Sequence, residues 1–137
     1  MAELTEVGLE LIKSFEGLRL QSYQDSGGIW TIGYGHTKGV KPGQKITEAQ
    51  ADEFLTEDLE QAEADVQTFV KFPLSDNEYS ALVSFAFNLG ARNLRDLVSY
   101  GKARVPSRIM LFNHVQGRQL PGLTRRRAAE RKLFLGG

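Results

Sequence analysis

The chain has 137 residues, of which 41% are hydrophobic and 25% are charged, a composition that is ordinary for a globular protein. It contains no cysteine, which excludes disulfide bonds and thiolate metal sites. Its two histidines stand far apart in the sequence and argue against a histidine-based metal centre. We therefore expect one globular domain that works without a metal or another cofactor.

No apolar run reaches the roughly 18 residues that a membrane span requires. No signal-peptide pattern opens the chain either. These observations predict a soluble, monomeric protein that is made in a cytoplasm and does not insert into a membrane.

The formal net charge of zero hides an asymmetry between the two halves of the chain. Residues 1–70 carry 13 Asp/Glu and 5 Lys/Arg, whereas residues 71–137 carry 4 and 12. The halves either present solvated faces that attract each other, or the basic half steers toward an anionic surface such as a cell wall or a nucleic acid. The charge balance alone does not choose between these alternatives.

The N-terminal part predicts a helix and a β-hairpin. Residues 4–17 have the apolar spacing of a helix, with Thr5 as its N-cap and Gly17 at its end. The segments 18–24 and 29–35 are rich in β-formers and flank a glycine-containing turn, which predicts two antiparallel strands.

A long helix is predicted next. Thr47 and Gln50 form a capping-box signature, and apolar residues follow at helical spacing. We therefore predict a single domain in which a helix at about 47–70 connects one lobe, at about 1–46, to another at about 71–137.

The second lobe is predicted to be all-helical. Ser75 and Glu78 form another capping box, opening a helix that Gly90 ends. After a short helical or irregular stretch, Pro106 suits the first turn of a helix of about ten residues. A loop then leads to a last helix capped by Thr124. The predicted class is α+β, with a ligand-binding cleft between the lobes.

Three polar residues each allow a structural and a functional interpretation. Glu16 falls on the apolar face of the first helix, where it is either exposed at the helix end or half-buried as a general acid. Asp25 is a common turn opener, and Thr31 is a common strand residue. Sequence pattern alone leaves the functional interpretation open.

His36 and Asp58 predict a structural contact. Asp58 interrupts the apolar stripe of the long helix, and a buried charge requires a partner. His36 ends the hairpin segment that this helix must cover. We therefore predict an ion pair between these two side chains that holds the hairpin to the helix.

Arg125, Arg126 and Arg127 follow the predicted cap directly, where cations oppose the helix dipole. They either lie on a solvated face or contact a polyanion, or one of them turns inward against a carboxylate. For the last alternative we take Arg125 as the arginine and Glu16 as its partner.

Four segments carry a family resemblance: "FEGLRLQSYQDSGGIWTIGYGHT", "ITEAQADEFLTEDL", "FAFNLG" and "LPGLTRRRAAE". Together they resemble the phage endolysins of glycoside hydrolase family 24, the phage-type lysozymes, from about Thr5 to Phe134. The Glu-x8-Asp-x5-Thr spacing is the most specific part. The resemblance implies a lysozyme-like fold and a muramidase that cuts the β-1,4 bond between N-acetylmuramic acid and N-acetylglucosamine in peptidoglycan.

The resemblance also assigns catalytic roles to Glu16, Asp25 and Thr31. Glu16 would protonate the leaving oxygen, Asp25 would activate a water, and Thr31 would help to hold that water. This is the inverting arrangement, in which the two carboxyl groups stand about 6.5–9.5 Å apart. A nearby arginine would lower the pKa of an acid, so an arginine contact to Glu16 is in tension with its role.

Further expectations concern sugar contacts and departures from the family pattern. Tyr34, Phe87 and Asn88 are predicted to contact substrate, because aromatic and amide groups suit sugar rings and acetamido groups. Packing in the core is an equal alternative for Phe87. Leu94 replaces a usual Phe, and His114 stands where the family commonly has a core Trp, which indicates altered packing in the second lobe.

Three other functions remain as alternatives. A lytic transglycosylase would cut the same bond without water and would need only Glu16. A cell-wall-binding module would need none of the three residues, and a nucleic-acid binder would rest on the basic half. If the chain is an endolysin, the resemblance implies that it stays in the host cytoplasm until a holin opens the membrane.

Overall fold

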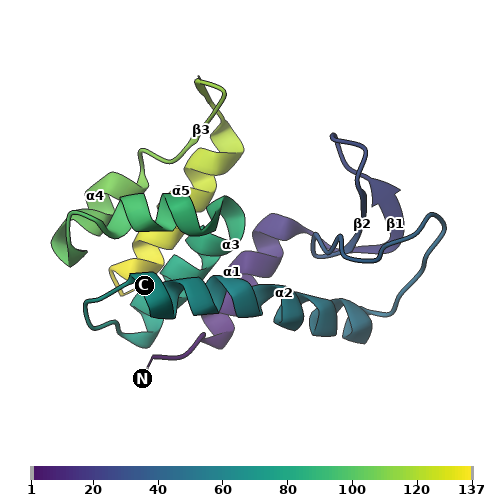
Figure 1. The fold of residues 1–137 in the computed structure, drawn as a ribbon, viewed down its shortest axis with the longest axis horizontal. Helices are drawn as coiled ribbons and strands as arrows, with labels where there is room; N and C mark the ends of the chain where they lie inside the picture. Colours follow the sequence, from purple (N-terminus) through teal and green to yellow (C-terminus); the bar gives the residue numbers. More distant parts are fainter. Residues whose placement is uncertain (1, 137) are drawn as a thin grey trace. The chain divides into compact units, whose positions relative to one another are not determined.

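The computed structural model describes residues 2–136 and has the element order shown in Figure 1. The elements are α1 (Glu6–Glu16), β1 (Arg19–Gln24), β2 (Trp30–Gly33), α2 (Glu48–Phe69), α3 (Asp76–Val98), η1 (Lys102–Arg104), α4 (Val105–Ile109), β3 (His114–Val115), β4 (Arg118–Gln119) and α5 (Pro121–Phe134).

The chain forms two compact units. The hairpin unit is Ile12–Gln61, and the helical unit combines Met1–Leu11 with Ala62–Gly137. The start of the chain therefore belongs with the helical unit. The physical reason is a set of contacts to α3, in which the Thr5 N–H donates to Ser80 Oγ at 2.9 Å.

Gly8 completes the contact between α1 and α3. A Cβ at Gly8 would lie 2.5 Å from Ser80 Cβ, so only glycine allows the two helices to approach this closely. The Glu3 N–H also donates to Asp76 Oδ1 at 2.9 Å. The N-terminal residues are therefore attached to α3 by hydrogen bonds and close packing.

The hairpin unit is built around the antiparallel pair β1–β2. Arg19 pairs with Gly33 and Tyr23 with Thr31, with an irregularity between these pairs. Its core contains Ile12 from α1, Ile32 from β2, and three residues from the first half of α2, namely Ala51, Leu55 and Leu59.

The helical unit is built around α3, and α5 packs against it (Figure 1). The predicted break at Gly90 is present, since this residue has φ 85° and ψ 173° inside α3. The helix resumes after the break and continues to Val98. The stretch predicted as helical or irregular is therefore helical.

The capping predictions are confirmed at three helices. Thr5 Oγ1 accepts the N–H of Gly8 at 2.9 Å, and Ser75 and Glu78 form a complete capping box. At α2, the Thr47 N–H donates to Gln50 Oε1 at 2.9 Å, and the Gln50 N–H donates to Thr47 Oγ1 at 3.2 Å.

Two predictions for the second half are wrong. The helix beginning near Pro106 ends at Ile109, and the segment after it forms the short hairpin β3–β4. The last helix begins at Pro121, so Thr124 lies inside it and donates its hydroxyl to the Leu120 carbonyl at 3.2 Å. Proline in the first turn starts this helix, because its missing N–H costs nothing there.

Within residues 2–136, no helix has both the length and the apolar character that crossing a lipid bilayer requires.

Candidate active site

Glu16 is the last residue of α1, and its side chain is half-buried. Gly17 ends the helix with φ 72°, a left-handed conformation that glycine adopts without strain. The Glu16 carboxylate lies close to Gly35, where an added Cβ would come within 3.3 Å of Oε1. The helix end thus presents this acid to the segment that follows β2.

Asp25 lies directly after β1 and shapes the turn of the hairpin. Its Oδ1 accepts the N–H groups of Gly27 at 2.8 Å and Ile29 at 2.9 Å. Both bonds use the same carboxylate oxygen, so they orient the side chain and leave Oδ2 outside this hydrogen-bonded turn. Asp25 itself is exposed.

Thr31 is joined to Asp25 through the peptide groups of Ile29. The Thr31 hydroxyl donates to the Ile29 carbonyl at 3.0 Å, and that carbonyl also accepts the Asp25 N–H at 2.9 Å. Thr31 is only 4% exposed. One residue of the hairpin therefore fixes both the carboxylate and the hydroxyl.

The structure brings the three predicted catalytic residues into one unit. Glu16 comes from α1, Asp25 from the turn, and Thr31 from β2, all within the hairpin unit. A carboxyl group beside Gly35 and a second carboxyl group bonded to the hairpin backbone are the groups that acid–base cleavage of a glycosidic bond requires.

His36 and Asp58 are in direct contact. His36 Nδ1 lies 2.8 Å from Asp58 Oδ2 and 3.1 Å from Oδ1. A carboxylate only accepts, so Nδ1 carries the proton in this contact. The His36 ring also stacks on Phe54, with ring centroids 4.2 Å apart and an interplanar angle of 6°. These contacts join the hairpin to α2 inside the hairpin unit.

The three arginines of the run differ in burial. Arg125 is exposed, whereas Arg126 is 4% exposed and Arg127 is fully buried. Within the helical unit, Arg126 and Arg127 meet the carboxylate of Glu130, one turn further along α5. A contact between Arg125 and Glu16 stays a prediction. On α5 the positions of Arg126 and Arg127 face α3, and this decides which arginines turn inward.

Glu130 is the centre of a buried cluster. Its Oε1 lies 2.7 Å from Arg127 Nε, and its Oε2 lies 3.3 Å from Arg126 Nε and accepts the Ser84 hydroxyl at 2.5 Å. Burial raises the pKa of Glu130, while the two guanidinium groups and Ser84 act to lower it. Glu130 and Ser84 are not among the residues predicted from the sequence, although a Glu that follows Arg127 by three residues and Arg126 by four has the spacing of a helical ion pair.

Arg127 also binds one of the predicted sugar-contacting residues. Its Nη2 donates to Asn88 Oδ1 at 2.8 Å, and its Nη1 donates to the Phe112 carbonyl at 3.3 Å. The amide oxygen of Asn88 is therefore engaged within the helical unit. Its neighbour Phe87 is half-buried.

Tyr34 belongs to the hairpin unit and is only 7% exposed. Lys13 Nζ lies 5.5 Å from the centroid of its ring. Only a small part of the ring surface is therefore exposed.

Leu94 and His114, the two departures from the family pattern in the second half of the chain, differ in burial. Leu94 is fully buried in α3, as a replacement for a core Phe would be. His114 is exposed in β3, where it pairs with Gln119, so it does not take the core position that the family commonly gives to Trp. The hairpin that replaced the predicted helix carries this side chain out to solvent.

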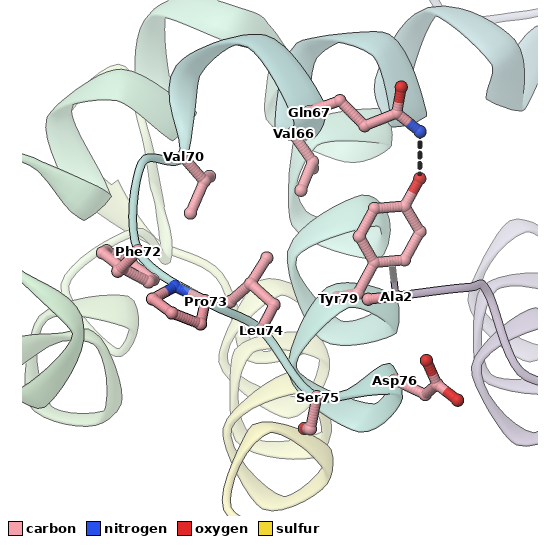
Figure 2. A pocket seen from close by; sticks show the side chains of 10 residues that line it. All are labelled: Ala2, Val66, Gln67, Val70, Phe72, Pro73, Leu74, Ser75, Asp76 and Tyr79. Atoms are coloured by element: carbon pink, nitrogen blue, oxygen red, sulfur yellow. Dashed lines mark hydrogen bonds between the residues drawn. The ribbon is translucent and has the colours of Figure 1, made fainter.

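The helical unit contains a cavity of about 580 Å³ between the end of α2 and the start of α3 (Figure 2). Its lining includes Val66, Val70, Leu74 and the ring of Tyr79. The Tyr79 hydroxyl donates to Glu63 at 2.8 Å. None of the predicted site residues lines this cavity.

Among residues 2–136, no group of three or more His, Asp or Glu side chains is arranged to hold a metal ion.

Solved structures resemble this chain over its whole length. The muramidase domain of SpmX from Asticaccaulis excentricus superposes with a TM-score of 0.90 at 37% identity, covering 100% of both chains. A mutant of P22 lysozyme superposes with a TM-score of 0.85 at 34% identity, covering 99% of this chain and 100% of the other. The predicted fold class is confirmed: this is an α+β, lysozyme-like protein.

The sequence comparisons identify the family. Residues 13–130 match the family model described as phage lysozyme. An endolysin of Acyrthosiphon pisum secondary endosymbiont phage 1 is 41% identical, over 96% of this chain and 97% of its own length. The chain covers less of some longer relatives, such as 54% of an endolysin of Bacillus phage B103.

The chain belongs to the phage lysozyme family. It is accordingly a glycoside hydrolase of the lysozyme type, an enzyme that degrades peptidoglycan.

Proposed function

We propose that this enzyme hydrolyses the β-1,4 bond between N-acetylmuramic acid and N-acetylglucosamine by an inverting mechanism. The observation that carries the proposal is the hydrogen-bonded unit of Asp25, Ile29 and Thr31, with Glu16 at the end of α1 in the same compact unit. In this arrangement the carboxyl group of Glu16 can act as the acid, and the Asp25 carboxylate and the Thr31 hydroxyl can together hold a water molecule.

Glu16 acts as the general acid in this proposal. It is half-buried and lies beside Gly35, which leaves space next to its carboxyl group because glycine has no side chain. Its proton passes to the glycosidic oxygen as the bond to the anomeric carbon breaks.

Asp25 and Thr31 act on the water. The Thr31 hydroxyl hydrogen is directed to the Ile29 carbonyl, so its oxygen accepts a hydrogen bond from the water. Asp25 keeps Oδ1 on the turn and accepts the proton of the water at its carboxylate. The water oxygen then attacks the anomeric carbon from the face opposite to the leaving group.

The stereochemical part is tested by proton NMR of the first-formed sugar. An inverting enzyme releases the α-anomer from a β-linked glycan, and this anomer then mutarotates. An initial β-anomer would instead show a retaining route, with Asp25 as a nucleophile.

The residue assignments are tested by the clearing of outer-membrane-permeabilised Gram-negative cells. We expect Glu16→Gln and Asp25→Asn each to reduce the rate at least about 100-fold, as loss of a general acid or base does. Thr31→Val removes the hydroxyl while Thr31→Ser retains it, so Ser should keep more activity than Val. Equal clearing by the native chain and Glu16→Gln would rule out the assignment.

A lytic transglycosylase is the second candidate, because it needs the acid alone. It predicts an almost silent Asp25→Asn and products lighter by one water in a mass spectrum. The hydrogen-bonded arrangement of Asp25 and Thr31 favours hydrolysis, since a water-free reaction has no use for it.

The sugar contacts are a further part of the proposal. We propose that Phe87 and the Nδ2 group of Asn88 contact the glycan, with Tyr34 contributing through its small exposed surface. A substrate contact of this kind predicts a raised KM for Asn88→Ala with a smaller change in kcat.

Release from the host cytoplasm through a hole made by a second protein is the route that we propose to the wall. The similarity to phage endolysins supports it. Expression in a bacterium with and without a pore-forming protein tests it: lysis should require the pore, and lysis without it would contradict this route.

A further inference from the structure

The net positive charge of the second half of the chain lies in residues 102–136. Residues 71–101 contain three Lys/Arg and three Asp/Glu, whereas residues 102–136 contain nine Lys/Arg and a single acid, Glu130. Because Glu130 is fully buried between two arginines, residues 102–136 present no carboxylate side chain to solvent.

Four of these nine cations have carboxylate partners. Arg126 and Arg127 bind Glu130 in the interior. Lys102 binds Glu78 at 2.9 Å, and Arg108 binds Asp96 at 3.1 Å.

The other five cations are exposed and have no ion pair within residues 2–136. They are distributed over η1, β4 and α5 of the helical unit, and we refer to them together as the cationic surface: Arg104, Arg118, Arg125, Arg131 and Lys132. The elements that carry them belong to one unit, and Arg131 Nε donates to the Pro106 carbonyl at 3.1 Å, which joins α5 to α4. Figure 1 shows these elements in green and yellow.

Exposed apolar side chains gather in the same segment. Within residues 2–136, five of the nine exposed large apolar side chains fall between residues 100 and 135. They are Tyr100, Leu111, Val115, Leu120 and Leu135, and their exposed fractions run from 39% at Leu120 to 66% at Tyr100. This segment therefore combines unpaired cations with unburied aliphatic groups and has no exposed acid.

This combination distinguishes between anionic partners. A site for a single-stranded nucleic acid combines cations with aromatic side chains on which the bases stack. Only one of the five exposed apolar side chains, Tyr100, is aromatic. An anionic bilayer binds both cationic and aliphatic side chains, because its headgroups attract Lys and Arg while aliphatic side chains enter the boundary with the acyl chains.

We propose that the cationic surface and the neighbouring apolar side chains bind the headgroup region of an anionic phospholipid bilayer. The protein lies on the membrane through α4, α5 and the β3–β4 hairpin and does not span it. This attachment is separate from the acid–base chemistry of the hairpin unit and does not depend on it.

Co-sedimentation with phospholipid vesicles tests the proposal. We expect binding to phosphatidylcholine vesicles that contain about a quarter phosphatidylglycerol, little binding to pure phosphatidylcholine, and weaker binding as salt is raised. Glu16→Gln should bind as well as the native chain, which separates this result from any failure of the proposed catalytic roles.

Charge variants provide a matched comparison. The triple variant R104Q/R118Q/K132Q should lower the vesicle partition coefficient at least about tenfold, since each cation near an anionic membrane contributes to binding. The control K38Q/K41Q/K45Q removes three exposed cations from the hairpin unit and should change it less than about twofold. Far-UV circular dichroism and urea midpoints show that both variants are folded.

Apolar variants separate a bilayer from other polyanions. Leu111→Ser with Leu135→Ser should weaken vesicle binding, whereas Val7→Ser with Leu18→Ser, exposed elsewhere, should not. Equal binding by the two charge variants would overturn the proposal. A second result would also overturn it. In that result the native chain does not bind the anionic vesicles but binds DNA or isolated peptidoglycan, and R104Q/R118Q/K132Q loses that binding.

Discussion

The Nε atom of Arg127 lies 2.7 Å from Oε1 of Glu130, and both side chains are fully buried. Arg126 shares the same carboxylate, so the cluster places two cations and one anion in the interior of the helical unit. Burial also lowers the pKa of Arg127, while Glu130 acts to raise it. The cluster tolerates burial because its partners are present together.

Removing the anion should be costly. Glu130→Gln removes the buried carboxylate that Arg126 and Arg127 share, and we expect the free energy of unfolding to fall by about 3–5 kcal/mol. Urea unfolding measures this change. Asp96→Asn, at the exposed pair with Arg108, is the control and should cost at most about 1 kcal/mol. Equal losses for the two variants would contradict a structural role for the cluster.

Gly35 offers a test of the position of Glu16. In Gly35→Ala the new Cβ would lie 3.3 Å from Glu16 Oε1, so the carboxyl group must shift. The residue also has φ 84°, which costs about 1–2 kcal/mol for a side-chain-bearing residue. We expect a loss of clearing activity of about tenfold, because catalysis depends on the placement of the acid against the bond that it protonates.

Gly39→Ala is the matched control for this substitution. Gly39 has φ 70° but nothing within 4 Å of its added Cβ, so it carries the same backbone penalty without the contact to Glu16. Its urea midpoint should fall by a similar amount while its activity stays near that of the native chain. Identical activity in the two variants would show that the Gly35 contact does not position the acid.

The contact between His36 and Asp58 predicts energetic coupling. A double-mutant cycle with His36→Gln and Asp58→Asn should give a coupling energy of about 1–3 kcal/mol in urea unfolding, because both groups are partly or fully withdrawn from water. Strictly additive single effects would show that the contact contributes nothing to holding the hairpin on α2.

Tyr79 predicts a loss of stability in alkaline solution. Burial, together with the hydrogen bond to Glu63, raises the pKa of Tyr79 from 10.0 to about 12. Its contribution is therefore fully present below about pH 10 and is lost as pH rises toward 12, since the unfolded state loses its proton first. The decline amounts to about 2–3 kcal/mol at most.

Tyr79→Phe isolates this contribution, because the variant lacks only the hydroxyl group that loses its proton. The difference in unfolding free energy between the native chain and the variant should shrink as pH rises from 10 to 12. A difference that stays constant over this range would contradict the raised pKa. The residue is visible at the edge of the cavity in Figure 2.

Local sequence signals predicted much of the fold. The caps at Thr5, Thr47 and Ser75 are hydrogen bonds between residues three apart, so the chain encodes them within one helical turn. The hairpin followed from β-formers on either side of a turn. The contact of His36 with Asp58 was also predictable, because an acid on an apolar stripe requires a partner and the hairpin supplied one.

The candidate catalytic residues depended on more than local pattern. The composition of the chain and the periodicity of α1 left Glu16 and Asp25 open to a structural interpretation, and the spacing to Thr31 acquired meaning from the family resemblance. Their detailed geometry could not be predicted. The bonds of Ile29 to both Asp25 and Thr31 depend on how the turn folds back on β2.

Contacts between distant segments decided the remaining features. Three consecutive arginines have the same local chemistry, and only the packing of α5 on α3 exposes Arg125 while burying Arg126 and Arg127. The hydrogen bond from the Thr5 N–H to Ser80 also depends on the tertiary structure, because the two residues are 75 positions apart in the chain. Short-range hydrogen bonds are encoded by neighbouring residues, whereas burial is set by whichever surface the completed fold places against a side chain.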